Sequence, residues 1–338
     1  MMHYGLAPLS WLYLTGVRLR HWLYDRKILQ KQFAPLPVVS IGNLVAGGAG
    51  KTQAALLLAR ELARDFPVAV LSRGYRGRAE HAKDPLRVDI QKHSVQSTGD
   101  EPWLLASRLL QDAALVVVNK HRFKGALEAK KWGARLVILD DGMQHRALHR
   151  DFEIVVIDGQ TSLGPFLPRG QLREDPARLK DADVILFVGH PDPSVKKVVS
   201  KHTQAPQVVA RIISEGLFDL QGASMGSLEG VKVGVFCGIG NPDRFVKTVE
   251  ELGAQILLTH FSPDHQAPSE KELRAFANAA QNEGASLLVC TEKDKVKLTQ
   301  TGLALPVGWV KANLQIVLNQ EAWVKMVHEM KLIAGATP

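Results

Sequence analysis

The stretch Val38-Val39-Ser40-Ile41-Gly42-Asn43-Leu44-Val45-Ala46-Gly47-Gly48-Ala49-Gly50-Lys51-Thr52 decides the fold, because a β-branched run is followed by glycines and then by Gly-Lys-Thr. The alanine- and leucine-rich residues 53–62 that follow predict a helix. A strand, a glycine-rich turn and a helix in this order predict a phosphate-binding loop, in which backbone N–H groups and the helix N-terminus cradle phosphates. We therefore expect a nucleoside triphosphate and Mg²⁺ as ligands. The expected phosphate contacts come from Val45, Ala46, Gly47, Gly48, Ala49, Gly50, Lys51 and Thr52, and the Thr52 hydroxyl also binds the metal.

The loop departs from the usual pattern G-x-x-x-x-G-K-[ST] at its first glycine, where Val45 stands. We expect Gly42, Gly47 and Gly48 to bend the chain instead. A glycine-rich turn that binds nothing is the alternative interpretation. The strand before the loop, the helix after it and an acidic motif downstream favour phosphate binding.

Composition and charge narrow the class of protein. The chain has 338 residues, 46% of them hydrophobic, which is typical of a globular protein of about two domains. Its two cysteines, Cys237 and Cys290, lie in or beside apolar runs and predict buried thiols in a reducing compartment. The net charge of +8 favours contact with an anionic membrane, a phosphorylated substrate or nucleic acid. We recognise no nucleic-acid-binding module and expect no such partner.

The N-terminal residues combine an apolar run with a basic one. Residues 5–17 are mostly apolar and are followed by arginines, which is the reverse of the order in a signal peptide. No run reaches the roughly 18 to 20 apolar residues that span a bilayer. We expect residues 1–30 to form an amphipathic helix that lies on an anionic membrane surface. The alternative is a terminal helix packed on its own domain through the same apolar face.

Apolar β-branched runs alternate with helical patterns along the chain, which predicts an α/β fold with a parallel sheet. The runs at 67–71, 114–118, 136–139, 154–157 and 184–188 join the phosphate-binding loop in a core domain that we place at residues 31–214. Residues 207–213 are interpreted as an extended connector. A second series at 233–236, 255–258, 286–289 and 315–318 predicts a smaller α/β domain over residues 215–338, with helices starting near Asn241 and Ser269.

Two acidic motifs are candidates for chemistry. Residues 136–139 form an apolar run that ends in Asp140 and Asp141, the arrangement of a carboxylate that holds Mg²⁺ beside a phosphate-binding loop. Thr98-Gly99-Asp100-Glu101-Pro102 precedes a helix expected over 103–110. Thr98 and Glu101 fit a capping box, but Asp100 could equally accept the proton of an attacking hydroxyl while Glu101 supports Mg²⁺.

Basic and histidine residues near strand ends are further candidates. Arg73 and Arg173 suit phosphate oxygens, whereas Arg76 and Arg78 are expected to be solvated. His265 is a lone histidine, which is usually structural. The guanine-recognition motif of GTPases is incomplete at residues 119–122 and 291–294, so we expect adenine or no strict base choice.

Taken together, the motifs resemble those of the tetraacyldisaccharide 4'-kinase family, the lipid A kinases of Gram-negative bacteria. The resemblance runs from the N-terminal helix to about Lys297. It is carried by GNLVAGGAGKT, SRGYRGR, GDEPWLLA, VILDDGMQHRALHRD, LPRGQLRE, GIGNPDRF, FSPDHQA and TEKDKVKL.

This resemblance implies an enzyme at the cytoplasmic face of the bacterial inner membrane. It would move the γ-phosphate of MgATP to the 4'-hydroxyl of a tetraacyldisaccharide 1-phosphate, giving the 1,4'-bisphosphate. Matching motifs imply that Lys51 and Thr52 bind phosphates and Mg²⁺, and that Asp100 acts as base with His265, or with His260 as the alternative. Glu101 and Asp141 would serve the metal, and the groups that orient or stabilise charge would be Asp140, Gln144, Arg73, Arg122 and Arg173.

One alternative from another class stays open at this point. A membrane-recruited ATPase that acts as a switch or partition protein would share the phosphate-binding loop and the N-terminal patch. It would hydrolyse ATP with a positioned water and would lack a lipid acceptor. The sequence predicts no particular oligomeric state for either protein.

Overall fold

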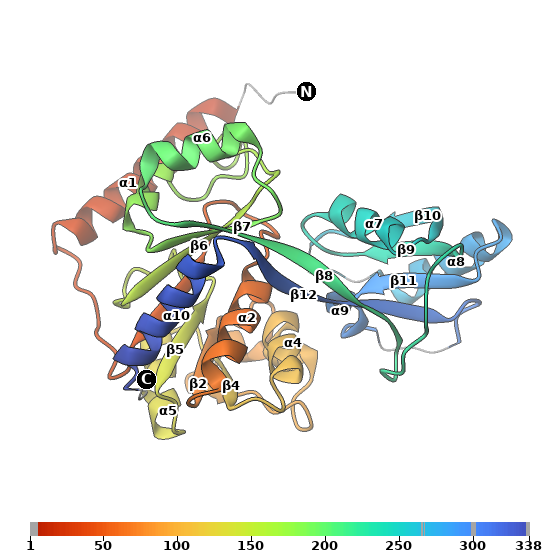
Figure 1. Cartoon of the computed structure of the whole chain (residues 1–338), viewed down its shortest axis with the longest axis horizontal. Coiled ribbons are helices and arrows are strands. Elements are labelled where there is room, and N and C mark those ends of the chain that lie inside the picture. The colour runs from red at the N-terminus through yellow and green to blue at the C-terminus, as the bar shows by residue number, and fades with distance from the viewer. Residues whose placement is uncertain (1–5, 265, 267, 299–301, 336–338) are drawn as a thin grey trace. The chain divides into compact units, whose positions relative to one another are not determined.

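The computed structural model describes residues 6–264, 266, 268–298 and 302–335. The chain forms two compact units, unit 1 (Met1–Arg211 with Leu314–Pro338) and unit 2 (Ile212–Asn313). Both combine helices with strands, so the expected α/β class is confirmed (Figure 1).

The α-helices are α1 (Ala7–Asp25), α2 (Lys51–Ala63), α3 (Val95–Thr98), α4 (Asp100–Arg108), α5 (Arg122–Lys131), α6 (Pro193–His202), α7 (Pro242–Glu251), α8 (Glu270–Asn282), α9 (Glu292–Lys295) and α10 (Gln320–Ile333); the 3₁₀ helices η2 and η3 span Arg78–His81 and Pro176–Asp181. The strands are β1 (Val38–Gly42), β2 (Val68–Ser72), β3 (Leu86–Arg87), β4 (Ala114–Val118), β5 (Leu136–Asp140), β6 (Phe152–Asp158), β7 (Val184–Val188), β8 (Gln207–Asp219), β9 (Lys232–Cys237), β10 (Gln255–Phe261), β11 (Leu287–Thr291) and β12 (Val307–Leu318).

The sheet of unit 1 runs in the order β8-β7-β6-β1-β5-β2-β4-β3. Its strands pair in parallel, except that β3 is antiparallel to β4. Strand β1 lies between β5 and β6, and Ile41 is in register with Asp140. Because the carboxyl ends of parallel strands meet at one edge of a sheet, this register brings the phosphate-binding loop and the acidic pair together.

Helices cover the strands of unit 1 because the strands are apolar on both faces. Alternate strand residues point to opposite faces, and one set, which includes Leu71 and Leu139, packs with Ala126 and Ala129 of α5. Helix α2 packs on β1, β2, β4 and β5 and buries six apolar side chains. Burial on both faces explains why these strands are continuous apolar runs in the sequence.

Unit 2 is a smaller parallel α/β unit with strand order β10-β9-β11-β12. Its helices begin where the sequence predicts. Asn241 caps α7 by accepting the Arg244 N–H, and Ser269 forms a capping box with Glu272 at α8. Cys237 and Cys290 are buried free thiols, as expected.

The C-terminal segment belongs to unit 1, whereas the sequence interpretation assigned residues 215–338 to the smaller domain. Strands β8 and β12 each have residues in both units, and residues 207–213, interpreted as a connector, form the first half of β8. Helix α10 then packs on α2 (Figure 1), where the Trp323 indole N–H donates to Glu61 Oε2 at 2.7 Å. Neither the length of a strand nor one hydrogen bond between residues far apart in the chain leaves a local pattern in the sequence.

Helix α1 docks on unit 1 through its polar face. Ser10 and His21 are buried, whereas Trp11 and Leu12 are each 71% exposed. The expectation that a docked α1 would bury its apolar face is therefore wrong. Among helices built from described residues, none combines the length and apolarity needed to cross a bilayer.

Candidate active site

The phosphate-binding loop turns at two glycines. Gly47 and Gly50 have φ of 112° and 93°, a region that favours glycine, and Gly50 is the N-cap of α2. Lys51 and Thr52 therefore occupy the first turn of α2, whose backbone N–H groups lack intrahelical acceptors. Gly42, expected to bend the chain, provides space instead, because a Cβ there would lie 2.3 Å from Met143 Cβ.

Val45 has a structural role that a glycine would not fill. Its side chain is buried, and its backbone forms an antiparallel bridge with Leu172. The neighbouring Ala46 N–H donates to Gln171 O at 2.8 Å. The loop that contains Arg173 is thus hydrogen-bonded to the phosphate-binding loop itself.

Asp141 is the centre of a cluster of charges. Arg173 donates to both carboxylate oxygens of Asp141 and to Asn43 Oδ1, and the Lys51 ammonium lies 3.7 Å from Asp141 Oδ1. Burial alone would raise the pKa of Asp141, but Lys51 and Arg173 outweigh it and lower the pKa. The ionised Asp141 therefore neutralises two cations that are suited to phosphate.

Asp140 lies beside this cluster, but its pKa is shifted in the opposite direction. Its side chain is buried, and burial together with the charges of Glu101 and Asp141 raises its pKa to about 7. Its Oδ1 accepts no hydrogen bond from any residue that the structure describes. Glu101 lies in α4 and Asp140 at the end of β5, so the effect of Glu101 on Asp140 indicates that the two acidic motifs lie close together.

This carboxylate cluster fits a divalent cation that is held partly by phosphates. Within the described residues, no group of three or more His, Cys, Asp or Glu side chains forms a ready-made cage. Mg²⁺ is commonly bound by one or two carboxylates and the oxygens of a nucleotide. The orphaned Asp140 oxygen and the repulsion among Asp140, Asp141 and Glu101 are what such an ion would relieve.

Arg122 and Arg73 lie at the same edge of the sheet. Arg122 is buried and donates to the carbonyl oxygens of Asn119 and Asp140, at 2.7 and 3.3 Å. Burial lowers its pKa to about 10, so it stays charged at neutral pH. Arg73 has a side chain that is 54% exposed, and its Nε donates to the buried Glu80 at 2.6 Å. Arg122 thus supports Asp140 from within the fold, whereas Arg73 can reach a ligand.

Asp100 is positioned by glycines. The N-cap of α4 is Gly99, with φ of 91°, and not Thr98. The Thr98 hydroxyl donates to Ser94 O instead of capping α4. The capping-box interpretation is therefore wrong, and the helix begins at Asp100 rather than at Trp103. A Cβ on Gly77 would lie 2.5 Å from the Gly99 nitrogen, so the loop after β2 packs directly on the turn before Asp100.

Gln144 connects the acidic loop to the phosphate-binding loop. Its side-chain amide donates to Asn43 O at 3.2 Å, and its own carbonyl accepts from Arg20 of α1. Asn43, Arg20 and Glu174 were not singled out by sequence reasoning. Asn43 lies inside the glycine-rich motif and Glu174 inside LPRGQLRE, so the motifs contained both without indicating their partners. His265 lies outside the described residues.

Comparisons with known proteins found matches over most of the chain. A family model described as tetraacyldisaccharide-1-P 4'-kinase matches residues 2–331. Tetraacyldisaccharide 4'-kinases of Chlamydia caviae and Syntrophotalea carbinolica are 38% and 37% identical to the chain, covering 96% and 92% of it and 89% and 88% of the relatives. The chain is also similar to the crystal structure of the "apo" form of LpxK from Aquifex aeolicus in complex with ATP. That match has a TM-score of 0.74 and 29% identity over 98% of this chain and 99% of the other.

Proposed function

Because the chain belongs to the tetraacyldisaccharide-1-P 4'-kinase family, we propose that it transfers the γ-phosphate of ATP to the 4'-hydroxyl of a tetraacyldisaccharide 1-phosphate. The product is the 1,4'-bisphosphate of lipid A biosynthesis. One observation carries the proposal: the phosphate-binding loop, the acidic strand end and Arg173 meet in one cluster.

Lys51 and Arg173 bind the phosphates in this proposal. Both cations face Asp141, and the β- and γ-phosphates of ATP are stronger anionic partners for them. With the phosphates paired to these cations, the Asp141 carboxylate would be able to hold a metal ion.

Mg²⁺ is proposed to be held by Thr52, Glu101 and Asp141 together with the phosphate oxygens. When bound, the ion would neutralise the charge that develops on the transferred group. Asp140 supports the site from the strand end, where its Oδ1 has no hydrogen-bond partner among the described residues, and burial together with the charges of Glu101 and Asp141 raises its pKa.

Asp100 is proposed as the base that accepts the proton of the sugar hydroxyl. It is buried at the first residue of α4, and its Oδ1 accepts the Glu101 N–H at 2.9 Å, which fixes the carboxylate beside the metal-binding Glu101. Phosphoryl transfer has a loose transition state, so a weak base in the correct position suffices. His265 assists Asp100, and Gln144, Arg73 and Arg122 orient the reacting groups or stabilise charge.

The acceptor is an acylated lipid, so we propose that the enzyme works at the cytoplasmic face of the bacterial inner membrane. The exposed face of α1 carries Leu9, Trp11, Leu12, Leu19 and Trp22, while its opposite face is docked on unit 1. Such a face lies in the boundary between headgroups and acyl chains, and the exposed Arg26 and Lys27 after the helix bind anionic lipid.

Mass spectrometry of the lipid product tests the proposal. Purified protein is incubated with MgATP and an acylated glucosamine disaccharide 1-phosphate in detergent micelles. We expect the lipid to gain the mass of one phosphate. Consumption of ATP without this gain would contradict the kinase assignment and favour a membrane-recruited ATPase switch.

A further inference from the structure

Helix α1 contacts the backbone of both loops that form the charged cluster. The Tyr13 hydroxyl donates to the carbonyl oxygen of Arg173 at 3.0 Å, and the Arg20 guanidinium donates to the carbonyl oxygen of Gln144. Arg173 binds Asp141, and Gln144 binds the phosphate-binding loop at Asn43. The helix with the exposed apolar face is therefore also hydrogen-bonded to both loops of the charged cluster.

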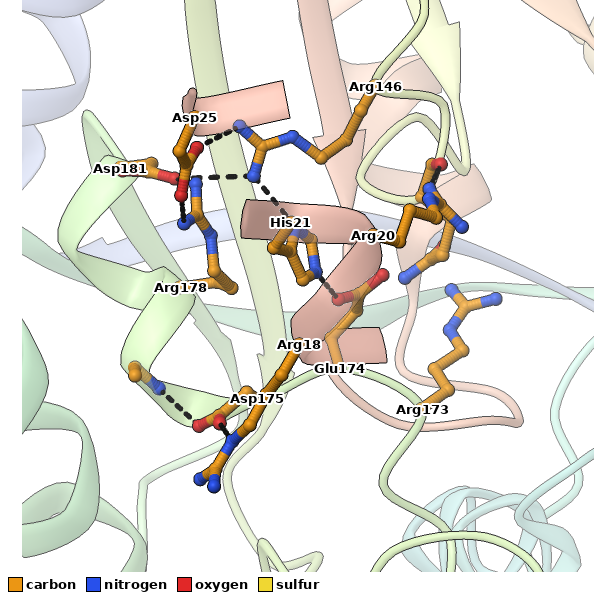
Figure 2. A network of polar contacts seen from close by, with 12 residues as sticks. Arg18, Arg20, His21, Asp25, Arg146, Arg173, Glu174, Asp175, Arg178 and Asp181 are labelled. Atoms are coloured by element: carbon orange, nitrogen blue, oxygen red, sulfur yellow. Dashed lines mark hydrogen bonds and ion pairs between the residues drawn. The ribbon is translucent and has the colours of Figure 1, made fainter. Parts of the chain in front are cut away.

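His21 is a buried residue of α1 that also contacts these loops. Figure 2 shows its ring between Arg146 and Glu174. The Arg146 Nη1 lies 2.8 Å from His21 Nδ1, and a guanidinium can only donate, so Nδ1 is the acceptor. The ring proton is therefore on Nε2, from which it is donated to Glu174 Oε2. The two hydrogen bonds fix the tautomer and the orientation of the ring.

Glu174 transmits this constraint to the site. It is buried and adjacent in sequence to Arg173, and the backbone N–H groups of both residues donate to Leu44 O, at 3.1 and 2.8 Å. Leu44 is part of the phosphate-binding loop. A buried carboxylate without its donor would move toward solvent or toward another cation, because an unpaired buried charge keeps its full desolvation penalty. Movement of Glu174 would displace the Arg173 guanidinium from Asp141.

We propose that His21 is a positioning residue for phosphoryl transfer, which acts by holding Glu174 and thereby placing Arg173. This inference rests on the proposed kinase function and adds a residue of the N-terminal helix to it. Among the described residues, the side-chain partners of His21 are Glu174, next to Arg173, and Arg146, in the loop after Asp141. The proposed route is the first of these, through residues 173–174.

Two variants of His21 separate positioning from folding. In His21→Gln, the amide can still donate to Glu174 and accept from Arg146, whereas His21→Leu can do neither. We expect His21→Leu to lower kcat about 10- to 100-fold, since small displacements of a catalytic group have effects of this size. The KM for ATP should rise as well, because Arg173 is proposed to bind the phosphates. His21→Gln should recover most of the loss.

Ser10→Ala is the matched control on the same helix. Ser10 is also buried and also makes two hydrogen bonds, donating to Phe166 O and accepting from Arg169 N. These partners are not Arg173 or Glu174, so we expect kcat to change less than about twofold. An equal loss in Ser10→Ala and His21→Leu would overturn the inference, because the cause would be general loosening of α1.

A double-mutant cycle with Arg173→Ala gives the second test. If His21 acts through Arg173, the double variant His21→Leu/Arg173→Ala should have a kcat within about twofold of that of Arg173→Ala. Full additivity of the two losses, or full activity of His21→Leu, would overturn the inference. Wild-type protein that leaves the lipid unphosphorylated would instead refute the proposed function.

Discussion

Asp140 is a buried carboxylate whose pKa is raised to about 7 by burial and by the charges of Glu101 and Asp141. In the metal-free protein, the folded state therefore binds a proton that the unfolded state releases near pH 4. The stability from this group is present below about pH 4 and is lost as pH rises toward 7. Asp140→Asn should consequently raise the free energy of unfolding at pH 8 by about 1–3 kcal/mol and weaken its fall between pH 5 and 8.

Chemical denaturation at pH 5 and pH 8, in buffer that contains EDTA, measures the free energy of unfolding of Asp140→Asn. Asp141→Asn is the control at the neighbouring residue. The pKa of Asp141 is lowered because Lys51 and Arg173 outweigh its burial. Its stabilisation is present above the ordinary pKa of the group, so the control should lower stability at pH 8. A change of the same sign in the free energy of unfolding of both variants at pH 8 would contradict the opposite pKa shifts of Asp140 and Asp141.

Asp100 is tested by Asp100→Ala. Loss of a general base lowers kcat by about 10²- to 10⁴-fold, and we expect a loss in this range in detergent micelles with binding of ATP intact. Asp112→Ala is the control, because Asp112 is a half-buried carboxylate outside the acidic cluster. Its Oδ2 lies 3.6 Å from Arg60 Nε. Full activity of Asp100→Ala would refute the proposed base.

At the scale of one element, α1 presents its apolar side chains outward because its polar side chains have partners in unit 1. Arg18 pairs with Asp175 at 2.8 Å, and Arg146 and Arg178 pair with Asp25 at 3.0 and 2.7 Å (Figure 2). The docked face is thus satisfied by ion pairs, and the apolar face is left without a covering element among the described residues.

Replacing Leu12 and Trp22 together by Gln should weaken binding to vesicles that contain anionic phospholipid. Full burial of a large apolar side chain contributes about 1.5–3 kcal/mol, so we expect at least a tenfold loss of affinity in a flotation assay. Val324→Gln is the control, because Val324 is 63% exposed on α10. Equal binding by the Leu12/Trp22 variant and the control would contradict membrane docking through α1.

At the scale of the whole molecule, the chain returns to unit 1 after unit 2 is complete. Trp323 of α10 is buried against α2 and donates to Glu61, a carboxylate whose pKa is raised by burial. Trp323→Ala should therefore destabilise the protein by about 3–5 kcal/mol, through lost apolar area and the loss of a hydrogen-bond donor to the partly buried Glu61. Thermal unfolding measures the loss, and hydrogen exchange should locate it at α2. Val324→Ala, one residue further on the exposed face, should have little effect, and equal losses would contradict docking through Trp323.

Patterns that are local in the chain could be predicted from the sequence. The strand, glycine turn and helix of residues 38–62, the acidic strand end at Asp140 and the caps of α7 and α8 depend on neighbours within a few residues, so composition and spacing report them directly. The parallel sheet also follows, because strands buried on both faces must be apolar throughout.

Contacts between distant residues required the tertiary structure. The pairing of Asp141 with Arg173, the docking of His21 on Glu174 and the bridge of Val45 with Leu172 join residues more than 30 positions apart, and the polar partners of α1 follow the same rule. Periodicity shows that a helix has an apolar and a polar face, but which face is covered depends on the partners that the fold supplies. Sequence by itself therefore determined the loop, the sheet and the family. The folded chain decided which carboxylate is ionised, which face of α1 is exposed and to which unit the C-terminal helix belongs.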